Sequence, residues 1–420
     1  MRVLCVSPLF PPTVNAESVC AAKWALALVS RGVDVTVIAD PPPAEADRRD
    51  ASSCWTPLAA RTVAVEVPGD LRFFETLRLG WRYRLGRLYP RWVDRIVSRA
   101  TELHREKPFD LVVSRSLPAR AHPAGRWAAR ALGVPWAAVI NDPWDYHLFP
   151  AGVLQGARDR RFVSNRWLRR TLREADALFG PSARLNDYNR RLARSDRRSD
   201  VCPHVGWAGG DAGASGRQEF RLVHAGVLGY EPLTGGRPAS GLLGGFARFL
   251  AGRPGARADA RLRLVGPEDP EAKALAGTLG LADAVTFAGR MRFEESLNEI
   301  ASASAGVVVE ARMEEGIYLP SKFTDYVAAG KPVLALSPAA GTIADFSAGE
   351  PAILRVDVDD EPAIERAIAT LYDEWRRDGL ASLGPSEKLQ STFRPETVAD
   401  TFIATVEKVL RHPQAVGVAL

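Results

Sequence analysis

The sequence contains little cysteine and no long apolar run. Its four cysteines, Cys5, Cys20, Cys54 and Cys202, follow no CxxC or metal-ligand spacing in 420 residues. This scatter argues against a disulfide framework and a structural zinc site, and we expect small buried thiols instead. No stretch approaches the roughly eighteen consecutive apolar residues that cross a bilayer. The opening MRVLCVSPLF is too short for a signal peptide, so we expect a cytoplasmic protein.

Low-complexity sequence is missing as well. The hydrophobic fraction of 46% and the charged fraction of 25% are typical of globular domains, which excludes disordered and fibrous classes. At 420 residues the chain exceeds the size that one hydrophobic core supports, so the length predicts two domains of about 200 residues each.

The formal net charge of +5 comes from bunched arginines. In residues 71–100, LRFFETLRLGWRYRLGRLYPRWVDRIVSRA, and again in RDRRFVSNRWLRRTLR, arginine alternates with aromatic residues. One interpretation is a solvated helix face with snorkelling arginines. The other is a surface that meets anionic lipid or a lipid phosphate, which would make residues 71–100 a peripheral contact with the inner face of the membrane. Nucleic acid is not expected, because no binding motif accompanies the charge. The oligomeric state stays open.

Short β-branched runs alternate with amphipathic segments along the chain. RVLCVSPLF, SVCAAKWALALVSRG and VDVTVIAD read as strand, helix and strand, and the same rhythm continues through FDLVVSRS, VPWAAVIND and EADALFGPS. Near-continuous apolar strands between helices predict parallel sheets covered on both faces.

The best linker is PHVGWAGGDAGASGRQ, which has no periodicity. A second α/β series follows it. The sequence therefore predicts an α/β fold of two doubly wound Rossmann-like domains that face a cleft, with a C-terminal helix that could pack on either domain. The expected boundaries are residues 1–205 for an acceptor-side domain, 206–218 for the linker, 219–390 for a nucleotide-sugar-binding domain, and 391–420 for the helix and tail.

The stretch EEGIYLPSKFTDYVAAGKPVLAL, residues 314–336, places a polar loop and a short helix between two buried strands. We expect Ser321 to cap the helix and Gly330 to end it. The free amides of the first turn, with Lys322, would seat a phosphate. Asp325 lies on the same face and could hold the paired hydroxyls of a ribose. The alternative is a surface ion pair between Lys322 and Asp325.

This stretch resembles the nucleotide-sugar motif of GT-B glycosyltransferases, in the retaining branch called glycosyltransferase family four, of its bacterial PSK type. The resemblance extends to VLCVSPLFPPTVNAESVCAAKWALALVSRGVDVTVIAD, to LPARAHPAGRWAARALGVPWAAVINDPWDY, to ADALFGPS and to LVHAGVLGYEPLTGGRP. Each motif is moderately specific, and their order and spacing together are strong.

On the donor side, the resemblance implies that Asp325 holds the ribose, and that Arg237 and Lys322 neutralise the pyrophosphate with the turn at Gly226. The family's other carboxylate would stand at Ile317, so Glu314 or Glu315 would have to serve. The remaining implied donor contacts are Gly316 and Ile317 through their amides, Ser321 at the helix start, and Arg290 near the base.

On the acceptor side, His122 takes the place of a family histidine that points at the donor sugar. Asn141 and Asp142 replace an Arg-Asp pair, which keeps the carboxylate and loses the cation. Trp144 could stack on a sugar ring. The loop PPTVNAES offers Asn15 and Glu17 where the family usually has glycine.

The resemblance implies transfer of a sugar from a UDP-, GDP- or other nucleotide diphospho-sugar to a hydroxyl on a glycan, a lipid-linked acceptor or a natural product. Retention would follow from front-face displacement, with His122, Arg237 and Lys322 as catalytic residues and with no metal or other cofactor. The Asp-Val-Asp at 357–359 precedes a helix, and Asp360 or Asp359 is interpreted as the N-cap of that helix. The alternatives are a GT-B nucleotide-sugar epimerase and an inactive GT-B partner subunit.

Overall fold

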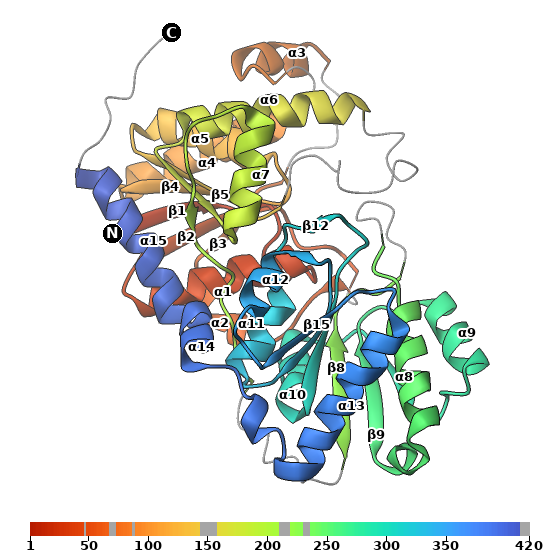
Figure 1. Cartoon of the computed structure of the whole chain (residues 1–420). Coiled ribbons are helices and arrows are strands. Elements are labelled where there is room, and N and C mark those ends of the chain that lie inside the picture. Colours follow the sequence, from red (N-terminus) through yellow and green to blue (C-terminus); the bar gives the residue numbers. More distant parts are fainter. Residues whose placement is uncertain are drawn as a thin grey trace. The chain divides into compact units, whose positions relative to one another are not determined.

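The computed structural model describes residues 1–45, 48–66, 73–85, 89–142, 158–209, 219–229 and 236–411, without the side chains of 158–165. These residues form two compact units (Figure 1). The first contains the described residues of Met1–Asp145, Asp159–Pro203 and Pro395–Leu420, and the second contains those of His204–Arg394.

The first unit is built on a seven-stranded sheet in the order β3-β2-β1-β4-β5-β6-β7, with every pairing parallel. All residues of β4 and β5 are buried, because helices cover both faces of the sheet. Its strands are β1 (Arg2–Val6), β2 (Asp34–Ala39), β3 (Thr62–Ala64), β4 (Leu111–Ser116), β5 (Trp136–Ile140), β6 (Ala177–Gly180) and β7 (Asp200–Val201). Its α-helices are α1 (Ala16–Ser30), α2 (Thr56–Ala59), α3 (Phe73–Arg82), α4 (Pro90–Glu106), α5 (Ala121–Leu132), α6 (Arg158–Glu174), α7 (Ala183–Ala193) and α15 (Pro395–Arg411).

The second unit has a six-stranded parallel sheet in the order β10-β9-β8-β11-β13-β15, and a separate two-stranded pair, β12-β14. The strands are β8 (Phe220–Ala225), β9 (Ala260–Val265), β10 (Val285–Gly289), β11 (Ala305–Val309), β12 (Glu315–Gly316), β13 (Val333–Leu336), β14 (Ala340–Gly341) and β15 (Ile353–Val356). The α-helices are α8 (Ser240–Gly252), α9 (Pro270–Thr278), α10 (Phe293–Ser302), α11 (Ser321–Ala328), α12 (Thr342–Ser347), α13 (Glu361–Asp378) and α14 (Glu387–Phe393).

In both sheets the first strand lies in the interior, and the order in which strands are added reverses beside it, at β1/β4 and at β8/β11. Ligands of open parallel sheets bind outside the carboxyl ends of the strands at such a switch point. The predicted pair of doubly wound Rossmann-like units is therefore confirmed, and each unit has one edge where a site is expected.

The C-terminal helix α15 belongs to the first unit, where it packs on α1 (Figure 1). The ring of Phe402 lies 5.1 Å from Trp24 and 4.8 Å from Phe179. These three apolar side chains are buried, so the helix is anchored by the hydrophobic effect rather than by its charges. The sequence had left its docking partner open. Among the described residues, no helix is both long and apolar enough to cross a membrane.

Candidate functional site

The switch point of the second unit carries a lysine and a histidine in contact. Lys322 lies in the first turn of α11, and its Nζ is 3.1 Å from Nε2 of His224, the penultimate residue of β8. Nδ1 of His224 lies 3.0 Å from the carbonyl oxygen of Val307. Because a carbonyl only accepts, Nδ1 carries the proton and Nε2 accepts from the lysine. Burial, followed by the charge of Lys322, holds the pKa of His224 well below its usual value.

The start of α11 differs from the expectation in one detail. The N-cap is Pro320, without a side-chain hydrogen bond, and Ser321 is the first helical residue. Proline has the fixed φ that suits an entry into a helix, so the cap geometry does not need the serine hydroxyl. The prediction of Ser321 as N-cap is wrong. The free amides still belong to the first turn, where Lys322 lies.

Gly226 and Arg237 surround the same lysine. A Cβ on Gly226 would lie 2.5 Å from Nζ of Lys322, and its φ of +138° favours glycine. Arg237 pairs with Gly229 through two backbone hydrogen bonds of 2.8 Å. Burial, followed by repulsion from Arg237, holds the pKa of Lys322 well below its usual value. The three residues expected at the pyrophosphate are thus gathered around one point, with a surplus of positive charge.

A buried carboxylate that the sequence analysis missed lies in this cluster. Glu310 directly follows β11 and is 3% exposed. Within the described part of the chain, neither carboxylate oxygen has a hydrogen-bond partner. Burial raises the pKa of Glu310 to about 7, although Arg237 lowers it. The available signal was an acidic residue ending the apolar run GVVVE, since a charge at the carboxyl end of a parallel strand is well placed for a ligand.

Of residues 314–317, Gly316 lies beside Glu310. Glu314 is exposed, whereas Glu315 and Gly316 form β12 and pair with Ala340–Gly341 of β14. A Cβ on Gly316 would lie 3.0 Å from Oε2 of Glu310, so the glycine backbone approaches the unpartnered carboxylate closely. The side chain of Ile317 is fully buried. Arg290, the remaining donor-side candidate, is exposed directly after β10.

Asp325 has a structural partner that the sequence did not predict. Its Oδ1 accepts a 2.9 Å hydrogen bond from the backbone amide of Trp207, and the side chain is buried. Nearby, a Cβ on Gly206 would lie 2.4 Å from the carbonyl oxygen of Thr324. The segment that enters the second unit is therefore held against α11 by Asp325, while Lys322 on the same helix reaches His224. A simple surface ion pair does not describe these two side chains.

In the first unit, acceptor-side candidates from two distant segments meet. Asn15 caps α1 by accepting from the amide of Glu17 at 2.8 Å, and Glu17 accepts from Nδ2 of Asn141 at 2.5 Å. Both Glu17 and Asn141 are buried. Burial, only partly offset by Arg115 on β4, holds the pKa of Glu17 well above its usual value, and Asp142 adds to the rise. The asparagine that replaces the expected cation thus has a specific partner. Trp144 lies outside the described residues.

His122 lies in the first turn of α5 and is fully buried. Its Nδ1 is 2.9 Å from Oγ of Ser114 on β4, which also accepts from Nε1 of Trp136 at 2.8 Å. Since that serine oxygen already receives one proton, its own hydroxyl proton can be donated to His122. Burial, reinforced by Arg115, lowers the pKa of His122 to about 3, so the ring is neutral. Arg115, buried at 3% exposure and close to both sites, was not singled out from the sequence.

The acidic triplet at 357–359 has structural roles. Asp359 forms an ion pair with Arg312 at 2.6 Å, and the following Asp360 caps α13 by accepting from the amide of Ala363 at 2.9 Å. Of the two residues interpreted as the N-cap, Asp360 is the cap. Within the described ranges, no group of three or more histidine, cysteine, aspartate or glutamate residues could hold a metal ion.

Comparison with known proteins bears on the fold of the chain and on the kind of domain in its first half. Residues 17–204 match the model of the glycosyl transferase 4-like domain. Those residues are similar to a domain of that kind. No curated protein sequence matches the chain. Sucrose-phosphate synthase from Thermosynechococcus elongatus superimposes with a TM-score of 0.65 at 17% identity, over 98% of this chain and 99% of that one.

HepE from Anabaena, solved in complex with UDP and glucose, gives a TM-score of 0.66 at 13% identity, over 97% of this chain and all of its own. UDP-GlcNAc 2-epimerase from Neisseria meningitidis, bound to UDP-GlcNAc, gives 0.55 at 10% identity, over 97% and 100% of the two chains. The fold is therefore GT-B. The predicted resemblance to GT-B glycosyltransferases of the family-four kind is confirmed, and sugar transfer is the activity that the findings favour.

Proposed function

We propose that the protein transfers a sugar from a nucleotide diphospho-sugar to a hydroxyl acceptor with retention of anomeric configuration. The observation that carries the proposal is the cluster of Lys322, His224, Arg237 and Gly226 at the carboxyl end of β8. Two cations, with glycine backbone beside them, suit a diphosphate better than any neutral ligand. Anabaena HepE, of the same fold, was solved with UDP-glucose.

In this proposal, Lys322 and Arg237 stabilise the charge that develops on the departing diphosphate. His224 aims the ammonium, because its Nε2 accepts from Nζ at 3.1 Å. No metal or other cofactor is part of the proposal. The amides at the start of α11 would add donors, as helix N-termini do for phosphate groups.

Glu310 takes the role that the sequence analysis gave to Glu314 or Glu315. Its oxygens lack partners in the described part of the chain, and it lies against Gly316. A carboxylate that accepts hydrogen bonds from sugar hydroxyls would find there the donors it now lacks. We propose that Glu310 contacts the transferred sugar and that Asp325 contacts the ribose. Glu17, Asn141 and His122 of the first unit would serve the acceptor and the sugar.

A second candidate is a nucleotide-sugar epimerase, since an epimerase from Neisseria meningitidis has the same fold with a TM-score of 0.55. Incubation with donor alone, followed by product analysis, separates the two reactions. Epimerisation gives an isomerised or hydrolysed sugar without an acceptor, whereas the proposed transferase leaves the donor largely intact. A third reading, an inactive partner subunit, requires that no nucleotide sugar is turned over with any acceptor.

The experiment that narrows the substrate is a thermal-shift screen against UDP-, GDP-, ADP- and dTDP-sugars. One donor series is expected to raise the melting temperature through preferential binding to the folded state. Hits would then be tested with glycan, lipid-linked and natural-product acceptors. If none of the four series shifts the melting temperature, the proposed transfer reaction is wrong. A cytoplasmic location with a peripheral membrane contact completes the proposal.

A further inference from the structure

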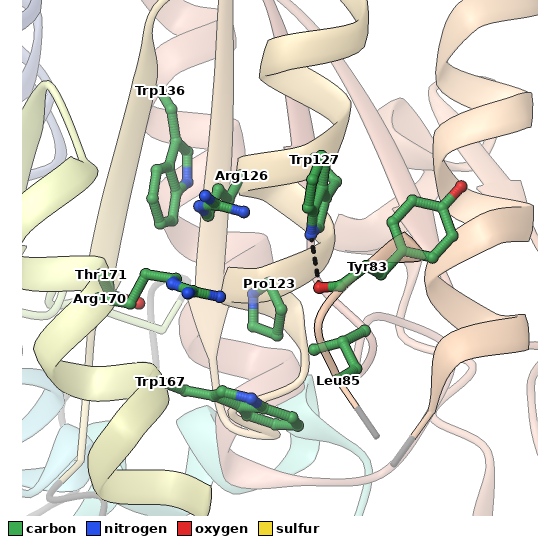
Figure 2. Close-up of a pocket in the computed structure, with 9 residues that line it drawn as sticks. All are labelled: Tyr83, Leu85, Pro123, Arg126, Trp127, Trp136, Trp167, Arg170 and Thr171. Atoms are coloured by element: carbon green, nitrogen blue, oxygen red, sulfur yellow. Dashed lines mark hydrogen bonds between the residues drawn. The ribbon is translucent and has the colours of Figure 1, made fainter. Parts of the chain in front are cut away.

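A second candidate binding site lies in the first unit, between α5, α6 and the residues that follow α3 (Figure 2). It is a hollow of about 260 Å³, counting the part that is open to solvent. Most of that volume is open to solvent and the enclosed part is about the size of one water molecule, so a ligand would lie at the mouth of the hollow and insert a single oxygen atom. Its main lining side chains are Tyr83, Trp127, Trp136, Trp167, Arg126 and Arg170.

One lining side chain is a buried cation with an unused donor. Arg126 on α5 is 5% exposed, and its Nε donates to Oε2 of Glu174. Its Nη1 is buried without a hydrogen-bond partner among the described residues. Figure 2 draws the guanidinium between Trp136 and Trp127, facing the part of the hollow that Arg170 borders. A buried charged donor without a partner is destabilising, so a ligand that accepts from it would bind favourably.

Among the side chains that the structure describes, the charges around the hollow do not balance. Glu174 serves Arg126, Arg130 at 3.2 Å and Arg170 at 3.4 Å, which leaves one carboxylate against three guanidinium groups. Burial keeps the pKa of Arg170 below its usual value; the attraction of Glu174 opposes this shift, and repulsion from Arg166 and Arg84 adds to it. An anion with several acceptor oxygens would offset this surplus, and phosphate matches the fork of an arginine.

The helix that leads into the hollow exposes aromatic side chains. On α3, Phe74 is 84% exposed, Trp81 is 86% exposed and Leu77 is 41% exposed, with Arg78 and Arg82 also exposed on the same helix. Two residues after Trp81, the ring of Tyr83 lies 5.4 Å from Trp127, whose Nε1 donates to the Tyr83 carbonyl oxygen at 3.0 Å. Exposed aromatics among arginines are typical of a helix that lies in a lipid head-group layer.

We propose that this hollow binds the phosphate of an anionic membrane lipid, while α3 lies in the head-group layer beside it. The buried donor of Arg126 and the surplus of arginine define a phosphate site, and the apolar face of α3 identifies the lipid as its source. Of the two interpretations of the Arg-aromatic segment, α3 fits the lipid contact. The following helix α4 instead buries Trp92, Val93 and Ile96 in the core. The proposal does not depend on sugar transfer.

The test is co-sedimentation of the full chain with phosphatidylcholine vesicles that contain or lack phosphatidylglycerol. Wild type is expected to bind the anionic vesicles at least about tenfold better, and Arg126→Gln and the double variant Phe74→Ser/Trp81→Ser are each expected to lose about tenfold of that affinity. Arg248→Gln, which removes an exposed ion pair with Glu365 in the second unit, should bind like wild type. Anionic binding that Arg126→Gln leaves unchanged would overturn the phosphate site. If Arg126→Gln does not fold, Arg170→Gln provides the same test.

A second arm uses inorganic phosphate, with the fluorescence of the lining tryptophans as readout. Wild type and the α3 double variant should respond to phosphate, and Arg126→Gln should not. A response to phosphate without any binding to anionic vesicles would overturn the lipid and leave a site for a soluble phosphate. If wild type neither binds anionic vesicles nor changes its fluorescence with phosphate, the whole proposal is wrong. Nucleoside diphosphate binding should be the same in all these variants, so failure here is distinct from failure of the proposed transfer.

Discussion

Nζ of Lys322 lies 3.1 Å from Nε2 of a neutral, buried His224. The histidine orients the lysine side chain but cannot neutralise its charge, because a neutral imidazole supplies one acceptor and no charge. Burial, followed by repulsion from the nearby Arg237, holds the pKa of Lys322 well below its usual value in the free protein. A diphosphate would offset the repulsion between Lys322 and Arg237. We therefore regard Lys322 and His224 as part of a ligand site.

Gly226→Ala tests the space that this arrangement needs. The added Cβ would lie 2.5 Å from Nζ of Lys322, and the φ of +138° is unfavourable for alanine. We expect the lysine to be displaced and the affinity for nucleoside diphosphate to fall by about tenfold or more, as expected for loss of a charge-assisted hydrogen bond. Isothermal titration calorimetry measures this affinity. Gly255→Ala, where a Cβ meets nothing within 4 Å, is the matched control and should bind normally. Equal affinities of the two variants would contradict the expectation.

Glu310→Gln separates function from stability. Because burial raises the pKa of Glu310 from 4.5 to about 7, the folded state resists its ionisation. The protonated carboxyl therefore contributes to the free energy of unfolding. This contribution is fully present below pH 4.5 and is lost as the pH rises towards 7. The variant should be more stable than wild type at pH 8 by up to about 3 kcal/mol and equal to it at pH 4, measured by urea unfolding.

The same variant should transfer sugar about a hundredfold more slowly, the loss expected when a preorganised polar contact to the reacting sugar is removed. Glu365→Gln, which removes an exposed partner of Arg248, is the control and should change stability by less than about 1 kcal/mol. A stabilised Glu310→Gln protein with full activity would mean that this carboxylate has no part in the reaction.

Much of the fold follows from the sequence. The strands were recognised because parallel strands buried on both faces leave continuous apolar runs such as GVVV and WAAVI, and the lengths between them allow only crossover helices. The phosphate-seat residues Gly226, Arg237 and Lys322 were found because a resemblance links segments that are far apart in sequence. Such a pattern does not show which side chains contact one another.

His224 and Glu310 show this limit. Each is a polar residue at the carboxyl end of an apolar strand, a position that reads equally well as a strand boundary. Their importance depends on three-dimensional facts: the Val307 carbonyl that fixes the histidine tautomer, and the absence of any hydrogen-bond partner for the glutamate within the described residues. In the same way, Glu314 was a reasonable candidate by composition, but it is exposed.

Asp325 combines a structural contact with a proposed ligand contact, and the substitution Asp325→Asn can separate them. Asparagine keeps an oxygen that can accept from the Trp207 amide, now at 2.9 Å, so the fold should persist. If the carboxylate also holds the ribose, wild type should prefer a ribonucleoside diphosphate over its 2′-deoxy analogue by about tenfold, and the variant should lose that preference. Calorimetry with both nucleotides gives the answer. A preference that survives the substitution would leave Asp325 with its structural role alone.

The most direct test of the account is calorimetry of nucleoside diphosphate binding to wild type, Lys322→Arg and Lys322→Met, each in two buffers of different ionisation enthalpy. Because the pKa of Lys322 is depressed in the free protein and an anion raises it, wild type should take up protons on binding, with affinity that weakens as pH rises. Lys322→Met should bind at least about a hundredfold more weakly and without that uptake, while Lys322→Arg should retain part of the affinity. Binding by Lys322→Met as tight as wild type, or no binding of UDP, GDP, ADP or dTDP by wild type, would contradict the account.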